Sequence, residues 1–91
     1  MAIIAIFEIP TMSVEKYNAT LKQLSDAGAG APKGRVYHVA SKLDNGTQVV
    51  DVWNSSEEFD QFAKTLMPIM QTAGITIPQP RVTEVQNVIK G

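Results

Sequence analysis

Residues 44–59 read Asp-Asn-Gly-Thr-Gln-Val-Val-Asp-Val-Trp-Asn-Ser-Ser-Glu-Glu-Phe, and they predict a turn, a strand and a helix start in direct succession. Asn45-Gly46 is the pair favoured in two-residue type I′ turns, which need a positive φ at both positions. The run from Thr47 to Asn54 is rich in β-branched residues, as strands are. Ser55 and Glu58 have the spacing of a capping box. A hairpin that leads directly into a helix is therefore the centre of the predicted fold.

The residues before this stretch predict a strand, a helix and a second strand. The apolar run 2–9 predicts the first strand, which Pro10 closes. Thr11 and Ser13 offer N-cap oxygens for a helix that ends at Ala27-Gly28. The predicted apolar stripe of this helix consists of Val14, Tyr17, Leu21 and Leu24. The Gly-rich loop 28–34 lacks the glycine spacing of a phosphate-binding loop. Residues 35–41 predict the strand that pairs with 47–54.

The residues after it predict a second helix and a fourth strand. The predicted buried stripe of the helix consists of Phe59, Phe62, Ala63, Leu66, Met70 and Ala73. Pro68 lies inside this pattern and predicts a kink or a break near Leu66-Met67. Gly74 is expected to end the helix. Residues 77–80 form an extended linker, and residues 81–90 predict the last strand.

The element order is thus β-α-β-β-α-β in one domain, residues 1–91. This order predicts an α+β, ferredoxin-like fold: a four-stranded antiparallel sheet with two helices on one face. Strands one, three and four are apolar on both faces, although helices cover only one of them. A second copy of the sheet is the simplest cover for the other face, so we expect a homodimer.

Composition narrows the classes of function. The net charge of −1 offers no broad basic surface, so we expect no nucleic-acid partner. The apolar N-terminal run meets Glu8 too early for a membrane span or a signal peptide, which makes the cytoplasm the default location without a membrane partner. The chain has no cysteine and one histidine, so neither a disulfide nor a chelating set for a metal is expected.

The Asn45-Gly46 turn also fixes a strand register. It predicts that Asp44 faces Thr47, that Ala40 faces Asp51 and that His38 faces Trp53. Strand alternation then gathers one set on a single face: Val36, His38, Ala40, Val49, Asp51 and Trp53. The opposite face carries Val39, Val50 and Val52. The first face is mixed in chemistry and typical of a cavity wall, whereas the second is typical of packing.

Asp51 and His38 are the candidate catalytic residues, as acceptors of a proton from a ligand. Each has a structural alternative: Asp51 could pair with Arg81 or Lys42, and His38 could be a hydrogen-bonded, half-buried histidine. Trp53 either holds an aromatic substrate or fills the core. The remaining candidate substrate-binding residues are Val49, Phe62, Met67 and Met70. The two methionines suit a soft pocket wall or a gap in the core.

The stretch from Val49 to Phe62, with Trp53 followed by Asn-Ser-Ser-Glu-Glu-Phe, resembles the strand-to-helix junction of the dimeric α+β barrel superfamily. Antibiotic-biosynthesis-type monooxygenases belong to that group. The resemblance implies a homodimer whose sheets close into a barrel, and a cleft in each subunit between helices and sheet. It places Trp53, Asp51 and His38 toward the cleft and the valine face inside the barrel. Haem-degrading members carry an Asn on strand one and a His on helix two; this sequence has neither, and no cofactor is expected.

Two hypotheses of function follow. In the first, a cofactor-free homodimer binds a small apolar or aromatic molecule in the cleft, and proton removal by Asp51 or His38 gives a monooxygenase or another proton-transfer enzyme. In the second, the chain is a non-catalytic ligand-binding or association module. Fold alone does not decide between them, since function depends on the site.

Overall fold

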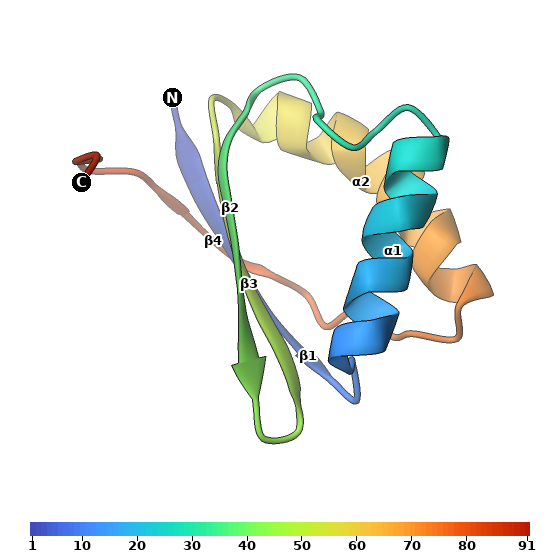
Figure 1. The fold of residues 1–91 in the computed structure, drawn as a ribbon. Coiled ribbons are helices and arrows are strands. Elements are labelled where there is room, and N and C mark those ends of the chain that lie inside the picture. Colours follow the sequence, from blue (N-terminus) through green and yellow to red (C-terminus); the bar gives the residue numbers. More distant parts are fainter.

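The computed structural model describes all 91 residues, and it confirms the predicted α+β, ferredoxin-like class. The elements are β1 (Ile3–Pro10), α1 (Val14–Asp26), β2 (Arg35–Leu43), β3 (Gly46–Trp53), α2 (Ser56–Thr72) and β4 (Arg81–Glu84). The strands form one antiparallel sheet in the order β2-β3-β1-β4. Figure 1 shows the sheet nearly edge-on, with both helices on the same side of it. One face of the sheet therefore has no layer over it.

The core lies between this sheet and the two helices. Alternate residues of β1 point into it, as do alternate residues of β3. Its largest fully buried side chains are Trp53 and Met70. The other main contributors are Ile3, Ala5, Phe7, Ile9, Leu24, Val49, Phe59 and Phe62. The odd-numbered face of β3, which also carries Asp51, is thus the face that meets the helices.

The two helices begin where the sequence predicts. Ser13 caps α1, accepting a hydrogen bond from the backbone N–H of Lys16 at 3.2 Å. Ser55 caps α2 in the same way for Glu58, also at 3.2 Å, and its hydroxyl donates to the Glu58 carboxylate at 3.0 Å. Such caps satisfy N–H groups that have no partner inside the helix.

The buried stripe of α1 differs from the predicted one. Val14 and Leu21 are exposed by 48% and 37%, whereas Thr20 is buried beside Leu24. The Thr20 hydroxyl donates to the carbonyl oxygen of Lys16 at 2.9 Å, which allows a polar side chain to be buried without cost to its hydrogen bonding. Tyr17, Thr20 and Leu24 form the face that meets the sheet, so α1 is turned relative to the stripe that hydrophobicity alone predicts.

Pro68 does not break α2, which continues to Thr72. A proline inside a helix removes one backbone donor, but Met70 beyond it is buried in the core and holds the last turn in place. The Thr72 hydroxyl donates to the Pro68 carbonyl at 3.0 Å. Gly74 follows with φ +72, as expected of a residue that ends a helix.

The hairpin forms, but its register differs from the predicted one by two residues. Leu43 faces Gly46, so Asp44 and Asn45 are the turn residues, and His38 faces Asp51 rather than Trp53. Gly46 has no positive φ. Instead, Gly46 lies against β1, where a Cβ would stand 2.1 Å from the carbonyl oxygen of Ile9. Gly46 is needed because the β1 backbone lies too close for any side chain at this position. The sequence of the turn alone does not reveal this contact with β1. Since the shift is even, the predicted partition of β3 between the two faces is kept.

A β-bulge interrupts β2 near its start. The pairing steps from Arg35 opposite Trp53 to Tyr37 opposite Val52, which leaves Val36 as an extra residue. Val36, predicted on the cavity face, is 41% exposed. The extra residue reverses the alternation, so Arg35 takes the place on the cavity face that Val36 was expected to occupy.

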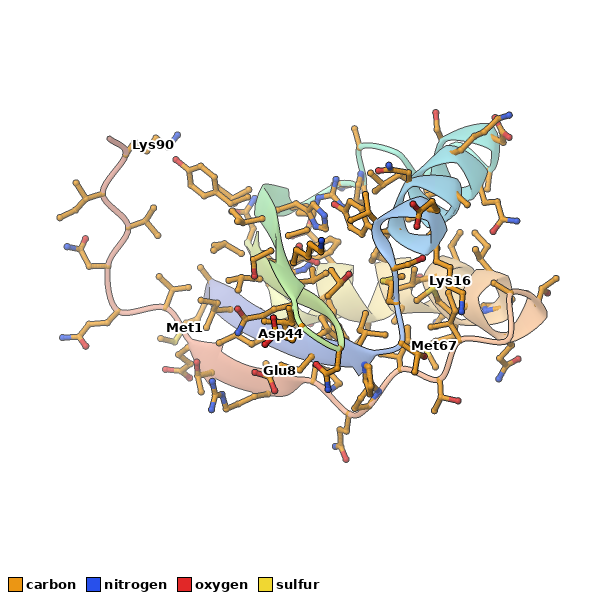
Figure 2. All side chains as sticks on the ribbon, turned by 60° about the horizontal axis from the view of Figure 1, so that its bottom comes forward. Met1, Glu8, Lys16, Asp44, Met67 and Lys90 are labelled. Atoms are coloured by element: carbon orange, nitrogen blue, oxygen red, sulfur yellow. The ribbon has the colours of Figure 1, made fainter.

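The last strand is shorter than predicted, since its pairing with β1 covers only Arg81 to Glu84. The pairing ends at Ile3 with Glu84, followed by a hydrogen bond of 3.0 Å from the Val85 N–H to the Ala2 carbonyl. Residues 85–91 then leave the sheet on its uncovered side, as the red segment in Figure 1 shows. In Figure 2, Lys90 marks the end of this tail, far from Lys16 and Met67 on the helices. Its ammonium lies 5.8 Å from the ring centroid of Tyr37.

Candidate functional site

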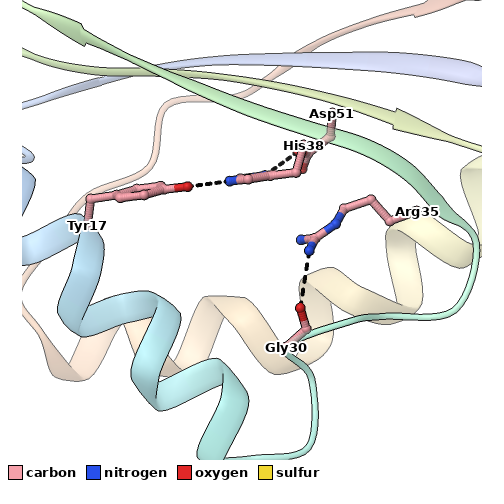
Figure 3. A network of polar contacts seen from close by, with 5 residues as sticks. All are labelled: Tyr17, Gly30, Arg35, His38 and Asp51. Atoms are coloured by element: carbon pink, nitrogen blue, oxygen red, sulfur yellow. Dashed lines mark hydrogen bonds and ion pairs between the residues drawn. The ribbon is translucent and has the colours of Figure 1, made fainter. Parts of the chain in front are cut away.

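Three polar side chains form a continuous hydrogen-bonded chain between α1 and the sheet. The Tyr17 hydroxyl lies 2.5 Å from Nε2 of His38, and Nδ1 of His38 lies 2.6 Å from Oδ1 of Asp51. Figure 3 shows the chain running from α1 through the β2 imidazole to β3. The rings of Tyr17 and His38 are almost parallel, at 6°. The chain exists because His38 faces Asp51 across the hairpin and α1 turns Tyr17 toward the sheet.

The partners fix the tautomer of the neutral imidazole. A carboxylate can only accept hydrogen bonds, so Nδ1 of His38 carries the hydrogen and donates it to Asp51. Nε2 is then the basic nitrogen, and it accepts from the Tyr17 hydroxyl. Asp51 is only 3% exposed and has no polar partner other than His38. The buried carboxylate therefore orients the ring and directs its lone pair toward the cleft.

The pKa of the Tyr17 hydroxyl is raised above its ordinary value of 10.0. Burial is the larger cause, because it disfavours the charged tyrosinate. The negative charge of Asp51 adds to the increase, and the positive charge of Arg35 opposes it. Tyr17 is therefore a hydrogen-bond donor at neutral pH rather than a base.

The chain borders a mainly apolar cleft between the helices and the sheet. The space in the cleft that the centres of water-sized spheres can occupy is about 50 Å³, and the cleft is partly open to solvent. Its walls include Phe7, Leu24, Val49, Phe62, Leu66 and Met70, and its polar groups include Tyr17, His38, Asp51 and Arg35. An apolar cleft with a few convergent polar groups is the usual form of a small-molecule site. The arrangement can accept a proton at Nε2 from a ligand hydroxyl that replaces Tyr17.

The structure brings five of the seven candidate residues to this cleft: His38, Asp51, Val49, Phe62 and Met70. The other two do not line it. Met67 is 41% exposed on α2, whereas Met70, one turn further on, is buried in the core. Trp53 is fully buried, with its ring centroid 5.2 Å from that of Phe62 and 5.7 Å from that of Phe59. Its indole N–H is buried and has no hydrogen-bond partner.

Sequence reasoning missed two members of the site. The helical spacing predicts Tyr17 in the apolar stripe of α1 and does not indicate that its hydroxyl meets His38. Arg35 reaches the cleft only because of the bulge at Val36. Neither position carries a local signal of function. The structure shows no group of three or more acidic or histidine side chains that could hold a metal ion, and no helix has the length and apolar character of a membrane span.

No family model matches the sequence, and no curated protein sequence matches it. Solved structures do match its fold. A candidate antibiotic biosynthesis monooxygenase from Chloroflexus aurantiacus superposes with a TM-score of 0.70 at 13% identity, over 99% of this chain and 98% of that one. A second protein so described, from Bacteroides thetaiotaomicron, gives 0.59 at 15% identity, over 100% and 91%.

MupZ from Pseudomonas fluorescens gives a TM-score of 0.58 at 16% identity, over 89% of this chain and 64% of that one. At these identities the likeness shows the fold alone, since one fold hosts many functions. It confirms, at the level of the fold, the resemblance to the antibiotic-biosynthesis-monooxygenase-like group.

Proposed function

We propose that this chain is a homodimeric α+β barrel protein that binds a small aromatic molecule in the helix–sheet cleft and acts as a cofactor-independent monooxygenase. The observation that carries the proposal is the Tyr17–His38–Asp51 chain at the wall of an apolar cleft. The fold shared with proteins described as antibiotic biosynthesis monooxygenases supports the reaction class.

The first step of the proposed reaction is a proton transfer. The hydroxyl of a phenolic substrate displaces the Tyr17 hydroxyl from Nε2 of His38 and gives its proton to that nitrogen. Asp51 holds the ring in the required tautomer and stabilises the imidazolium that forms. The Tyr17 hydroxyl, a donor at neutral pH, then hydrogen-bonds to the phenolate oxygen. His38 is thus the catalytic base, and Asp51 is a positioning residue.

The phenolate is electron-rich enough to react with dioxygen, which is the co-substrate. A ring C–H becomes C=O, so that a phenol becomes a quinone. One oxygen atom enters the product and the other leaves as water, which takes up the hydroxyl hydrogen and the ring hydrogen. The phenol loses the four electrons that dioxygen gains. No further reductant is needed, and the residues of the chain supply only binding, orientation and proton transfer.

The dimer in this proposal forms through the uncovered face of the sheet. That face carries an apolar set that no helix covers: Ile4, Ile6, Tyr37, Val39, Val50 and Val52. Val39 is 58% exposed. A second copy of the same face buries this set in an interface with two-fold symmetry.

A screen with two readouts tests the proposal. The purified protein is incubated with naphthols and hydroxynaphthoquinones, and we measure the shift in melting temperature and the uptake of oxygen. We expect at least one phenol to raise the melting temperature and to consume one O2 per quinone formed. His38→Gln is expected to abolish the uptake, whereas Tyr37→Phe, on the opposite sheet face, leaves it unchanged. Uptake by the His38→Gln protein equal to that of the wild type would contradict the proposed base.

A second candidate function is a non-catalytic ligand-binding or association module. One observation favours it: Tyr17 already satisfies Nε2 of His38, as expected of a purely structural network. Under this alternative, aromatic compounds either bind without oxygen uptake or do not bind at all. The same screen therefore separates the two candidates.

A further inference from the structure

Arg35 is the only positively charged side chain in the wall of the cleft. The bulge at Val36 places it on the same face of β2 as His38. In Figure 3 its guanidinium extends into the space beside the Tyr17–His38 pair, between the sheet and the loop at Gly30. A β-bulge that redirects a side chain is a structural feature frequent next to functional sites.

The guanidinium has no acidic partner. The structure contains one close contact between a basic side chain and a carboxylate, that of His38 with Asp51, so no carboxylate lies within 4.0 Å of the Arg35 guanidinium. The Arg35 side chain makes one hydrogen bond, from Nη2 to the carbonyl oxygen of Gly30 at 3.2 Å, and its guanidinium carbon lies 5.9 Å from the ring centroid of Phe62. A guanidinium has five N–H donors, so most of its donor capacity remains free. Beside an apolar wall, a carboxylate bound to it would interact more strongly than in water.

A purely structural role for Arg35 explains only part of this arrangement. The bond to Gly30 ties the loop to β2, which a neutral donor such as glutamine could also do. The cation–π contact with Phe62, at 5.9 Å from the ring centroid, uses no N–H donor, so the N–H edge is unused apart from the bond between Nη2 and Gly30. That edge suits a planar anion, because a guanidinium pairs with a carboxylate through two parallel hydrogen bonds.

The distance between Arg35 and His38 along the sheet determines how long a ligand must be to contact both. Arg35 and His38 face Trp53 and Asp51, which are two residues apart on β3. Such residues are separated by roughly 7 Å along a strand. A single small aromatic molecule can therefore present a hydroxyl to His38 and an anionic group to Arg35.

The geometry points to an aromatic hydroxy acid as the ligand of the cleft, with its carboxylate paired to Arg35 and its hydroxyl directed to His38. This inference rests on the proposed function and adds the substrate class. Arg35 is then the residue that selects acids over neutral phenols.

Two matched probes test it: 6-hydroxy-2-naphthoate and 6-hydroxy-2-naphthamide, which differ in the charge of one group. Their dissociation constants are measured by isothermal titration calorimetry at neutral pH and fixed ionic strength. The wild type is expected to bind the acid about tenfold or more tightly than the amide, as a charge-assisted pair implies. Arg35→Gln is expected to remove this preference. Lys33→Gln, with the same charge change outside the cleft, is expected to keep it.

Arg35→Lys guards against a folding defect in the glutamine variant. It keeps the charge but loses the planar fork, so it is expected to retain a smaller preference for the acid. Equal binding of the two probes by the wild type would overturn the inference and leave the proposed function intact. So would an unchanged preference in Arg35→Gln, its complete loss in a folded Arg35→Lys protein, or its loss in Lys33→Gln. Failure of both probes where neutral naphthols bind also overturns the inference alone, whereas failure of every aromatic compound overturns the proposed function with it.

Discussion

The hydroxyl of Tyr17 and Nε2 of His38 lie 2.5 Å apart, although the two residues are 21 positions apart in the chain. The contact joins a helix to an edge strand and places a protonated phenol against the basic nitrogen of the ring. In the proposed reaction, a substrate hydroxyl takes the position of the Tyr17 hydroxyl. The contact keeps Nε2 of His38 hydrogen-bonded and the ring oriented.

The titration of Tyr17 is the first test of this arrangement. In a Tyr37→Phe background Tyr17 is the only tyrosine, and we expect its pKa to lie above the ordinary value of 10.0. Asp51→Asn should lower the pKa of Tyr17, because the negative charge that disfavours tyrosinate is lost, yet burial should keep it raised. Arg35→Gln should raise the pKa further. Ultraviolet absorbance of tyrosinate measures all three, and shifts of the same sign in the two variants would contradict the assignment.

The same shift makes stability depend on pH in a defined direction. The folded state binds the Tyr17 proton more tightly than the unfolded chain does. The free energy of unfolding is therefore unaffected by this group below about pH 10 and falls as the pH rises from there through the folded-state pKa. Urea denaturation at several alkaline pH values measures it, and the slope should be smaller in Tyr17→Phe.

Asp51→Asn tests the role of the buried carboxylate in setting the tautomer of His38. A carboxamide can donate to Nδ1 and so move the ring hydrogen to Nε2, which removes the base. We expect kcat with a phenolic substrate to fall roughly 100-fold while KM changes little, in line with the loss of general-base catalysis. Nitrogen-15 NMR of the imidazole reports the tautomer without any substrate. An unchanged tautomer together with an unchanged kcat would show that Asp51 has no positioning role.

Features encoded by residues close together in the sequence could be predicted, whereas features set by contacts between distant segments could not. The β3-to-α2 junction is encoded locally, by Ser55 and Glu58 after a β-branched run, and it forms as predicted. The faces of β3 follow from simple alternation, which an even register shift preserves. The His38–Asp51 pairing needed the correct register, and that depends on the fit of Gly46 against the Ile9 carbonyl of β1. Tyr17 and Arg35 reach the site through a helix rotation and a bulge, which only the packed structure determines.

Trp53→Phe separates core packing from ligand contact. Trp53 is fully buried behind Phe62, and its N–H has no partner, so the substitution removes ring volume and also an unsatisfied donor. We expect the free energy of unfolding to fall by about 1–2 kcal/mol, less than for a truncation to alanine. The dissociation constant for 6-hydroxy-2-naphthoate is expected to stay within about twofold of the wild-type value. A large loss of affinity with little loss of stability would instead identify Trp53 as a ligand contact.

Gly46→Ala tests the physical reason for the hairpin register. The added Cβ would meet the backbone oxygen of Ile9 at 2.1 Å, and strand backbones cannot give way as a flexible side chain can. We expect a loss of about 3 kcal/mol or more in the free energy of unfolding. Gly28→Ala is the control, because Gly28 has φ +78 with nothing within 4 Å and should lose only about 1 kcal/mol. The free energy of unfolding is measured by guanidinium denaturation. Equal losses in the two variants would indicate that the close approach of Ile9 is not the reason for a glycine at position 46.

Val39→Lys tests the proposed dimer through the uncovered sheet face. Val39 faces Val50 on that side and is 58% exposed in the single chain, so a lysine there is tolerated by the folded subunit but not by an apolar interface. Multi-angle light scattering of the wild type at micromolar concentration should give twice the mass of one chain. Each dimer of the variant would bury two unpaired ammonium groups at a cost of roughly 2 kcal/mol or more apiece, so its Kd should rise by on the order of 1,000-fold. Val14→Lys, on α1 and 48% exposed, is the matched control and should leave the dimer intact. A wild-type protein that is monomeric at this concentration, or a Val39→Lys dimer as stable as the wild type, would place the interface elsewhere or remove it.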